Sequence, residues 1–308
     1  MRFIAADLSR LPPPDAIEAL DYEQVLAAMK ADVRARWDAL RVLRPELPEL
    51  DILELETDPI VIILEVAADR ETKLRGLVND KARAVMLALA TGADLDHLGA
   101  AVLTQRLELT PATSSAPAVM EADEPYRRRI HLALDAWSTA GAQGAYEYWA
   151  LSSDPSVKDA AALNVAPGRV DVVLLGRTGD GTASDAAIVA VYEALSPKTR
   201  RPLTDDVRVR SATIVPQAMR VRLDIPRGPD PDVVEMRARA NLAALASTIH
   251  AIGRVLRTDA IIVAARVGDV EKVTVLEPAA DLDPGAFGAV HVSAIEIEVV
   301  QPGQAIPA

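Results

Sequence analysis

The first regular pattern of apolar and polar positions is a helical stripe near the N-terminus. Apolar or aromatic side chains recur every three or four residues, at Tyr22, Leu26, Met29, Val33, Trp37 and Leu40. This spacing matches the α-helical repeat and predicts one amphipathic helix over residues 22–44. Pro45 and Pro48 then end the helix, because proline cannot continue it. Such a stripe packs either within its own chain or in a bundle of helices from several chains.

A second helical pattern follows and leads into a segment with no regular repeat. The tripeptide Thr57-Asp58-Pro59 has the order of a helix cap followed by proline in the first turn. The pattern continues to Ala90, and Gly92 is expected to end this helix. Residues 94–101 predict a short further helix. Residues 104–121 are rich in proline, serine and threonine and lack an apolar period, so they are predicted to form a linker.

Beyond residue 121 the pattern changes from helices to alternating strands and helices. The predicted helices cover 123–138, 144–152, 185–195 and 232–249, and the predicted strands cover 170–175, 207–215, 219–225, 270–276 and 289–300. Thr182 or Ser184 can cap the helix over 185–195. Two successive strand–helix–strand units suggest a duplication.

The sequence therefore predicts an α+β fold, with an N-terminal helical region followed by two consecutive strand-helix-strand α/β units and a C-terminal strand. The predicted division is an N-terminal region over 1–121, a first α/β unit over 122–217 and a second unit over 218–308 that includes the tail. Residues 260–266 are compatible with either helix or strand. We favour a short helix, because Thr258 can cap it and Gly268 can end it.

Composition and charge narrow the classes of partner. Lysine and arginine number 33 against 45 aspartate and glutamate, a net charge of −12, which repels a phosphate backbone and argues against nucleic acid. The absence of cysteine excludes disulfides, thiolate nucleophiles and zinc–thiolate sites. The basic runs 127–129 and 198–201 are interpreted as solvated faces. Without a signal-peptide pattern or an apolar run near the ~20 residues of a membrane span, we expect a soluble protein made in the cytoplasm.

The candidate for phosphate chemistry is the loop Gly176–Gly181, which lies between a predicted strand and a predicted helix. Helix N-termini after such loops bind phosphate through free N–H groups. The spacing here is GxxGxG, which matches neither the P-loop nor the dinucleotide fingerprint, and Asp180 repels phosphate. We interpret the loop as a flexible lead into a capped helix. The alternative hypothesis is a phosphate- or nucleotide-binding α/β enzyme that uses this loop.

Other candidate catalytic or metal-binding groups are weaker. Asp205 and Asp206 point to opposite faces of a strand, so they are interpreted as a strand entry. The four histidines are scattered, with no HxH or HxxxH pair, and no GxSxG sequence is present. The sequence therefore predicts no catalytic, cofactor-binding or metal site, and no enzyme.

The segment 138–155, STAGAQGAYEYWALSSDP, holds three of the ten aromatic residues and belongs to a longer series of motifs. With its surroundings it resembles the baseplate J family of contractile-tailed phages and tailocins. The family pattern is a Tyr-Arg-x-Arg-Ile helix, a Ser-x-Ala-Gly turn, a Tyr/Trp helix, an Asp-Pro turn and, later, an Arg-Pro-Leu-Thr-Asp turn. In chain order, the residues that match are Tyr126, Arg127, Arg129, Ile130, Gly141, Tyr146, Trp149, Asp154, Pro155, Pro202 and Asp205.

The resemblance extends from about residue 58 to 278 and also includes 90–96 and 167–170. It departs from the family pattern at 101–106, where a Gly-Val-x-Arg segment is usual. It implies a structural wedge protein without catalytic activity or cofactor, made in the host cytoplasm and carried in the mature virion or tailocin baseplate. A general soluble adaptor unrelated to tails is a third hypothesis.

The partners that the resemblance implies are all proteins of a tail, with no nucleic acid and no membrane. Two copies of the chain are expected to pair with a second wedge protein in a helix bundle, for which we assign the apolar stripe over residues 22–44. Further expected partners are a small lysozyme-like baseplate protein and neighbouring wedges in a six-fold ring around the hub. The ring is expected to link hub to sheath and to open on contraction.

Overall fold

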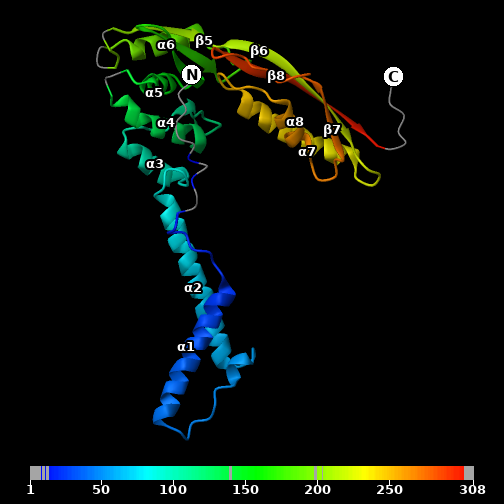
Figure 1. Cartoon of the computed structure of the whole chain (residues 1–308). Helices are drawn as coiled ribbons and strands as arrows, with labels where there is room; N and C mark the ends of the chain where they lie inside the picture. Colours follow the sequence, from blue (N-terminus) through cyan, green and yellow to red (C-terminus); the bar gives the residue numbers. More distant parts are fainter. Residues whose placement is uncertain are drawn as a thin grey trace. The chain divides into compact units, whose positions relative to one another are not determined.

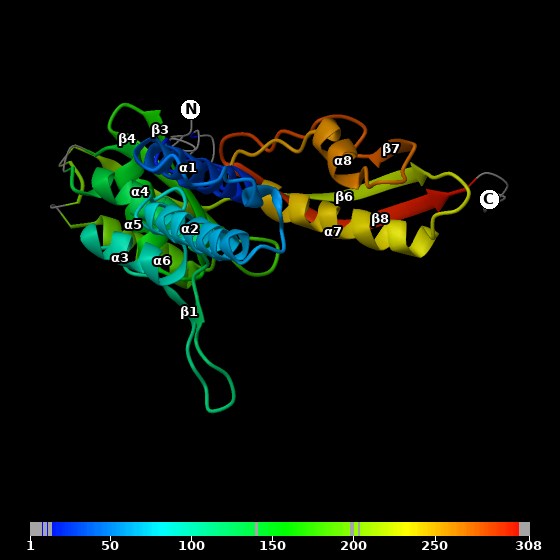
Figure 2. The same ribbon diagram turned by 90° about the horizontal axis from the view of Figure 1, so that it is seen from below.

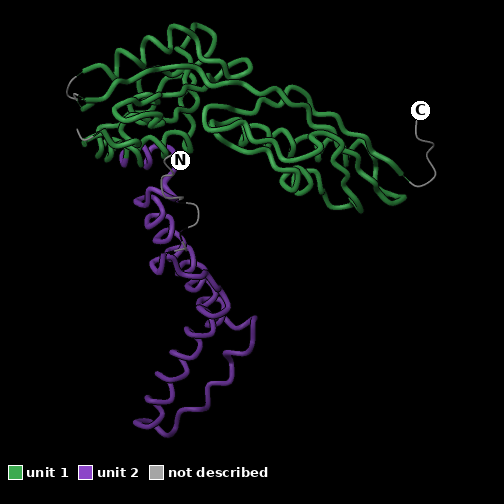
Figure 3. Tube along the Cα trace, turned by 45° about the horizontal axis from the view of Figure 1, so that its top comes forward, with its two compact units in different colours: residues 1–6, 99–308 green, residues 7–98 purple. Residues whose placement is uncertain are grey.

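The chain folds into two compact units, one within residues 7–98 and one within residues 99–308 (Figure 3). The computed structural model describes residues 8, 11, 14–138, 141–197, 200–202 and 204–301. Parts of the 138–141 turn, the 198–201 basic run, the 201–205 turn and the C-terminal tail lie outside these residues. We call the first the helical unit and the second the α/β unit.

The helical unit is built on two long helices that lie side by side (Figure 1). Helix α1 spans Tyr22–Leu43, close to its predicted bounds, and Asp21 caps it by accepting a hydrogen bond from the Gln24 N–H. A short 3-10 turn, η2, spans Ile52–Glu54. Helix α2 spans Pro59–Ala84 and begins as predicted, with Asp58 accepting from the Ile60 N–H at 2.8 Å.

The predicted C-terminus of α2 is wrong. The helix stops at Ala84, and the following residues form separate turns in which Ala90 N–H donates to the Met86 carbonyl. Gly92 does not end α2 but begins the short helix α3, Gly92–Ala101, with a φ of +53°. The apolar composition of this segment suits helix and turn equally, so propensity did not locate the boundary.

The predicted linker is also wrong in part, because it contains a β-hairpin. Strand β1, Glu108–Thr110, pairs antiparallel with β2, Val119–Met120. Strands this short show no alternation of apolar and polar residues. They form because side chains from elsewhere hold their base, as described below.

The α/β unit continues with a three-stranded sheet covered by helices. Its elements are α4 Asp123–Ala136, α5 Gln143–Ser153, β3 Val157–Ala166, β4 Arg169–Gly176, α6 Asp185–Leu195 and β5 Asp206–Ser211. The strand order is β3-β4-β5, with β3 and β4 antiparallel and β4 and β5 parallel across α6. Ser184 caps α6, one of the two caps predicted. Apolar residues from the helices and one sheet face form its core.

A second three-stranded sheet completes the unit. Its elements are β6 Thr213–Asp224, α7 Pro231–Ile249, α8 Thr258–Ala265, β7 Lys272–Glu277 and β8 Gly288–Val300, in the strand order β7-β6-β8. The predicted α+β class is confirmed, and residues 260–266 are helical except for Arg266. Thr258 does not cap α8 with its side chain. Instead, Asp281 accepts from the Thr258 N–H.

The predicted strand boundary near residue 215 is wrong, because the chain changes sheet at Ala212. Ala212 N–H donates to the Leu174 carbonyl in the first sheet, and the Thr213 N–H donates to the Phe287 carbonyl beside the second. The two units also differ in topology. Strand β6 runs antiparallel to β7 but parallel to β8, whereas β4 and β5 are parallel. The suggested duplication is therefore wrong at the level of strand pairing.

The two sheets share a small core that joins them into one unit. It contains Ala161, Leu163, Val173, Leu175, Ala212, Ile252 and Ala289, all less than a tenth exposed. Within the part of the chain that the structure describes, no helix is long and apolar enough to cross a bilayer. The three-part division at residues 121 and 217 stays a prediction.

Candidate functional site

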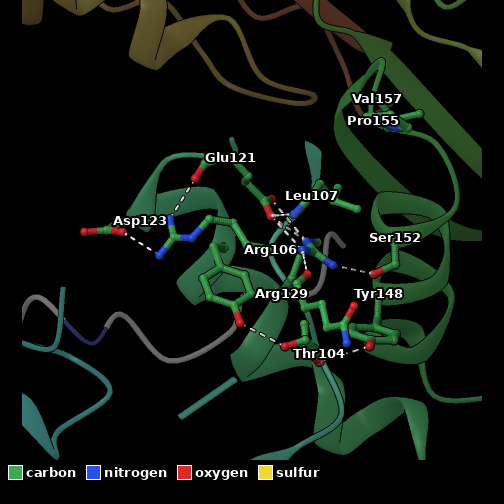
Figure 4. Close-up of polar contacts among 12 residues, drawn as sticks. Thr104, Arg106, Leu107, Glu121, Asp123, Arg129, Tyr148, Ser152, Pro155 and Val157 are labelled. Atoms are coloured by element: carbon green, nitrogen blue, oxygen red, sulfur yellow. Dashed lines mark hydrogen bonds and ion pairs between the residues drawn. The ribbon is translucent and has the colours of Figure 1, made fainter. Parts of the chain in front are cut away.

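The matched arginines of α4 are buried in a polar network, although the basic run was predicted to face solvent. The side chains of Arg129 and Glu121 are 4% and 2% exposed and form an ion pair at 2.6 Å (Figure 4). Arg129 also donates to the Ser152 hydroxyl at 3.1 Å and to the Gln105 carbonyl. The prediction of a solvated face is wrong, because each donor of Arg129 finds an acceptor inside the unit.

Glu121 connects this arginine to the base of the β1–β2 hairpin. Its Oε2 accepts from the Leu107 N–H at 3.2 Å, while its own carbonyl accepts from Arg106 at 2.7 Å. Arg106 in turn pairs with Asp123 at 2.8 Å. The two ends of the hairpin are thereby tied to the start of α4. Sequence reasoning missed Glu121 and Arg106, since the segment was assigned to a linker.

Tyr126 holds the same region through its hydroxyl group and its ring. Its hydroxyl donates to the Thr104 carbonyl at 2.8 Å, and the Thr104 hydroxyl lies 3.0 Å from that of Tyr148. The Arg106 guanidinium lies 4.6 Å from the centre of the Tyr126 ring, within cation–π range. A Cβ at Gly99 would lie 1.9 Å from the Tyr126 hydroxyl, so only glycine fits there.

Arg128, which lies between Arg127 and Arg129, interacts with the edge of strand β3 that is not paired with β4. It pairs with Asp159 at 2.6 Å and with Glu147 at 3.4 Å, and both acids are buried. Gln143 donates to the Ala162 carbonyl on the same edge. Arg128 also donates to the Ala160 carbonyl at 3.5 Å, so two carbonyls of this edge are bonded by side chains, which disfavours the pairing of a further strand at those residues. No signal in the sequence identified Asp159 or Glu147, because acids are frequent throughout the chain.

The remaining matched residues fall into three groups. Gly141, with a φ of +72°, lies against Pro202, since a Cβ at Gly141 would approach Pro202 to 2.7 Å. The Tyr146 hydroxyl donates to Asp205 at 2.7 Å, and burial raises the pKa of Tyr146 above its ordinary value. These four residues line a pocket of about 530 Å³.

The second group surrounds the end of α5. Trp149 packs edge-on against Tyr148 at 5.1 Å, and the Arg200 guanidinium lies over its ring at 3.8 Å. Asp154 forms the predicted turn by accepting from the Ser156 N–H at 2.7 Å. The carbonyl of Pro155 accepts from Arg177 at 3.0 Å.

Two further matched residues complete helix α4. Arg127 is 9% exposed and pairs with Glu124 one turn earlier. Ile130 is 4% exposed among the buried hydrophobic residues. All eleven matched residues thus have packing or turn roles.

Three amides of the glycine loop after β4, those of Gly176, Gly181 and Thr182, are bonded within the chain. Gly176 N–H donates to the Gly181 carbonyl at 2.7 Å, and the Gly181 N–H donates to Thr178 at 3.3 Å. Thr182 N–H donates to the Asp180 carboxylate at 2.9 Å, which also lowers the pKa of Asp180. A carboxylate of the chain itself therefore occupies the position that an anion would need.

Histidines 250 and 291, which are far apart in the sequence, meet where the two sheets join. Their ring centres are 5.4 Å apart, and His250 Nδ1 lies 2.9 Å from the Val290 carbonyl. Among the described residues, no three histidine, aspartate or glutamate side chains gather to hold a metal ion.

The apolar stripe of α1 packs in part on α2 of the same chain. Val25 and Leu26 are buried with Ala68, and Tyr22 and Met29 pack against them. Val33 and Trp37 are partly buried, and the Trp37 indole donates to the Pro48 carbonyl at 3.0 Å; Leu40 is 42% exposed. The assignment of the whole stripe to an intermolecular bundle stays a prediction, and the packing shows that part of it has an internal partner.

A second apolar face, missed in the sequence, lies on α2 and is open to solvent. Its large side chains are 43–67% exposed and comprise Ile60, Ile63, Val66, Leu74, Leu77 and Val78. At 100° per residue these positions gather on the side of α2 opposite Val61 and Ala68, which pack inward. The periodic signal was obscured because α2 is apolar on both sides.

The chain was also compared with protein families and with known proteins. Residues 56–113 match the Baseplate J-like N-terminal domain, and residues 138–211 match the Baseplate J-like central domain. The chain is 40% identical over 283 residues to Baseplate protein J of Escherichia phage P2, covering 90% of this chain and 91% of that protein.

Among solved structures, a chain in the anti-feeding prophage baseplate has a TM-score of 0.40 and 12% identity. That match covers 59% of this chain and 44% of the other, and it is too distant to carry an argument. The P2 relative is matched over nearly its full length at an identity that establishes common descent. The chain therefore belongs to the baseplate J family.

Proposed function

We propose that this chain is a wedge subunit of a contractile tail baseplate. Family membership supports a structural role in a phage baseplate, and the observation that carries it is the 40% identity across 90% of the chain. The finer role is that the chain assembles around the hub, links hub to sheath and rearranges on contraction. The internal bonds of the Gly176, Gly181 and Thr182 amides are consistent with a structural protein rather than a phosphate-binding enzyme.

The partners proposed are a second copy, a second wedge protein in a helix bundle, a small lysozyme-like baseplate protein and neighbouring wedges in a six-fold ring. The open face of α2 supports the bundle. Soluble proteins seldom leave so many large apolar side chains in one exposed row unless another surface covers them. Part of the α1 stripe already packs on α2 of the same chain. The open face of α2 is therefore proposed as the main contact surface for the bundle.

Charge on this face restricts the partner helix. Arg70 and Lys81 are exposed and, at 100° per residue, lie in the middle of the apolar row. Two copies of α2 facing each other about Arg70 would bring these arginines together. A helix that offers glutamate or aspartate between its apolar positions would pair with them instead. We therefore place a helix of the second wedge protein, rather than α2 of a second copy, on this face.

The test is co-expression of the full chain with its neighbouring tail proteins, followed by size-exclusion chromatography and electron microscopy. Wild-type chain is expected to form a heteromeric complex. Ile63→Glu and Leu74→Glu should abolish the complex without unfolding the chain, because both side chains are exposed. Ala35→Glu, on the exposed back of α1, is the matched control. A lone monomer with every candidate partner would contradict the wedge role.

These point changes are sharper than removal of residues 22–44. Deleting α1 should also abolish the complex, but it would uncover Ala68 and Leu64 on α2 as well. If the complex survives both glutamate changes but not the deletion, the bundle contact lies on α1 instead.

A further inference from the structure

Two cations of helix α2 differ from the other basic side chains of that helix. Helix α2 lies beside α1 in the helical unit (Figure 2) and carries five lysine and arginine residues. Three of them pair with an acid three or four residues earlier in the same helix, at 2.6–3.2 Å: Lys73 with Asp69, Arg75 with Glu71 and Arg83 with Asp80. The other two, Arg70 and Lys81, are exposed and have no ion-pair partner among the described residues.

Both unpaired cations lie inside the open apolar face of α2. Arg70 is one helical turn from Val66 and from Leu74, which are 53% and 62% exposed. Lys81 is one turn from Leu77, which is 52% exposed. At 100° per residue these five side chains project within about 80° of one another. A partner that covers the apolar side chains therefore covers the two cations as well.

Covering these cations requires acids on the partner. A charge that is removed from water without an opposite charge beside it strongly disfavours the complex. A long side chain at the rim of an interface extends its charged end back into water instead. Arg70 is not at a rim, because exposed apolar side chains lie on both sides of it along the helix. The partner must therefore place a carboxylate against it.

The spacing of the two cations specifies the spacing of the acids. Arg70 and Lys81 are eleven residues apart in an uninterrupted helix, which is close to three turns and about 16.5 Å along the axis. A partner helix that lies along α2 has the same rise and the same turn. Two of its residues that are eleven apart therefore face the two cations.

The acids of α2 itself do not meet this requirement. Glu65, Asp69, Glu71 and Asp80 project about 80° or more from the middle of the open face, as judged from 100° per residue. The last three also pair with cations of their own helix. If α2 of a second copy lay on this face, it would bring cations against cations. The occupant is therefore a different helix.

We infer that the partner on the open face of α2 is an amphipathic helix with two carboxylate side chains eleven residues apart, set among apolar positions, and that these carboxylates pair with Arg70 and Lys81. This inference rests on the proposed function and specifies the chemistry of the bundle partner. The apolar side chains supply the buried area, and the two ion pairs fix the register of the helices.

Charge reversal tests the pairing, in the full chain co-expressed with its neighbouring tail proteins. Arg70→Glu and Lys81→Glu should each weaken the heteromeric complex about 30-fold or more, because each places an acid against a carboxylate. Arg237→Glu reverses an exposed cation in the middle of α7 and is the matched control, which should leave the complex unchanged. Fluorescence anisotropy during dilution measures dissociation, and circular dichroism confirms that each variant keeps its helix content.

A carbodiimide crosslinker, which joins an amine directly to a carboxylate, tests the spacing. In the complex formed by the Arg70→Lys chain, the lysine introduced at position 70 and Lys81 should be joined to two acids of one partner chain, eleven residues apart. Mass spectrometry of the peptides identifies both acids. Crosslinks to another copy of this chain, a different spacing, or no intermolecular crosslink from either lysine would overturn the inference.

Failure of this inference is distinguishable from failure of the proposed function. A wild-type chain that forms no complex contradicts the proposed function. A complex that is lost in Ile63→Glu but persists in Arg70→Glu and Lys81→Glu leaves the open face of α2 as the contact and overturns only the paired acids.

Discussion

At the scale of single residues, burial and hydrogen bonding in this chain differ from what the residue type alone predicts. Arg129 and Glu121 belong to classes that normally face water, yet both are almost fully buried because each satisfies the other and several backbone groups. Charged side chains buried in this way stabilise only as a set. Removal of one member leaves the other with an uncompensated charge.

The first prediction concerns this pair. Arg129→Met should lower the free energy of unfolding by about 3–5 kcal/mol, because Glu121 then keeps its charge in a buried site. Arg129→Met combined with Glu121→Leu should recover part of that loss. Urea denaturation of wild type, both single variants and the double variant gives the coupling energy. Additive effects of the two changes would show that the pair does not act as a unit.

A second prediction concerns the pH dependence at His250. Burial lowers its pKa below the ordinary value of 6.5, and His291, Lys158 and Asp180 are the neighbouring ionisable groups. As the pH falls through 6.5 the unfolded chain takes up a proton before the folded chain does, so stability falls with it. His250→Asn, which keeps a donor for the Val290 carbonyl, should flatten this loss. Urea midpoints at pH 7.5, 6.5 and 5.5 measure the difference; parallel profiles would contradict it.

At the scale of elements, local patterns gave most helices and strands, and contacts between elements decided the exceptions. Asp58 and Ser184 cap their helices as the sequence indicated, and the structure adds a cap at Asp21. The hairpin and the change of sheet at Ala212 were missed, because hydrogen bonds to distant residues fix both. In helix α2 the open apolar face was missed for another reason: the helix has two apolar faces, and together they weaken the periodic signal of either one.

The third prediction separates the two faces of the helical pair. Leu26→Ala should cost about 2–5 kcal/mol of stability, because it opens a cavity between α1 and α2. Ile63→Ala should change stability by no more than about 0.5 kcal/mol, since its side chain is 67% exposed. Thermal unfolding of the full chain without partner proteins compares the two variants through the transition of the helical unit. A large loss from Ile63→Ala would show that this face is packed within the chain.

At the scale of the whole molecule, the chain comprises two units with separate cores. Among the described residues, three hydrophobic clusters of the α/β unit draw only on residues beyond 98, whereas Val25, Leu26 and Ala68 pack together in the helical unit. Within the α/β unit, Asp159 of β3 ties the first sheet to the segment between α7 and α8, since its carboxylate also accepts from the Ile252 N–H at 2.9 Å.

The fourth prediction follows from these separate cores. A chain shortened to residues 90–308, which keeps α3 whole, should remain folded and unfold cooperatively. Near-ultraviolet circular dichroism and a urea titration test this expectation. Loss of the near-ultraviolet signal would show that the α/β unit depends on the helical unit for its fold.

The sequence by itself determined the α+β class, most helix and strand positions and the resemblance to the baseplate J family. These depend on short-range order: capping residues, apolar periods and motif spacing are all read along the chain. The tertiary structure alone decided which charges are buried, where the chain changes sheet and which helix face stays open. Those features depend on residues far apart in sequence, such as Arg128 with Asp159 and Ala212 with Leu174, whose proximity no local pattern encodes.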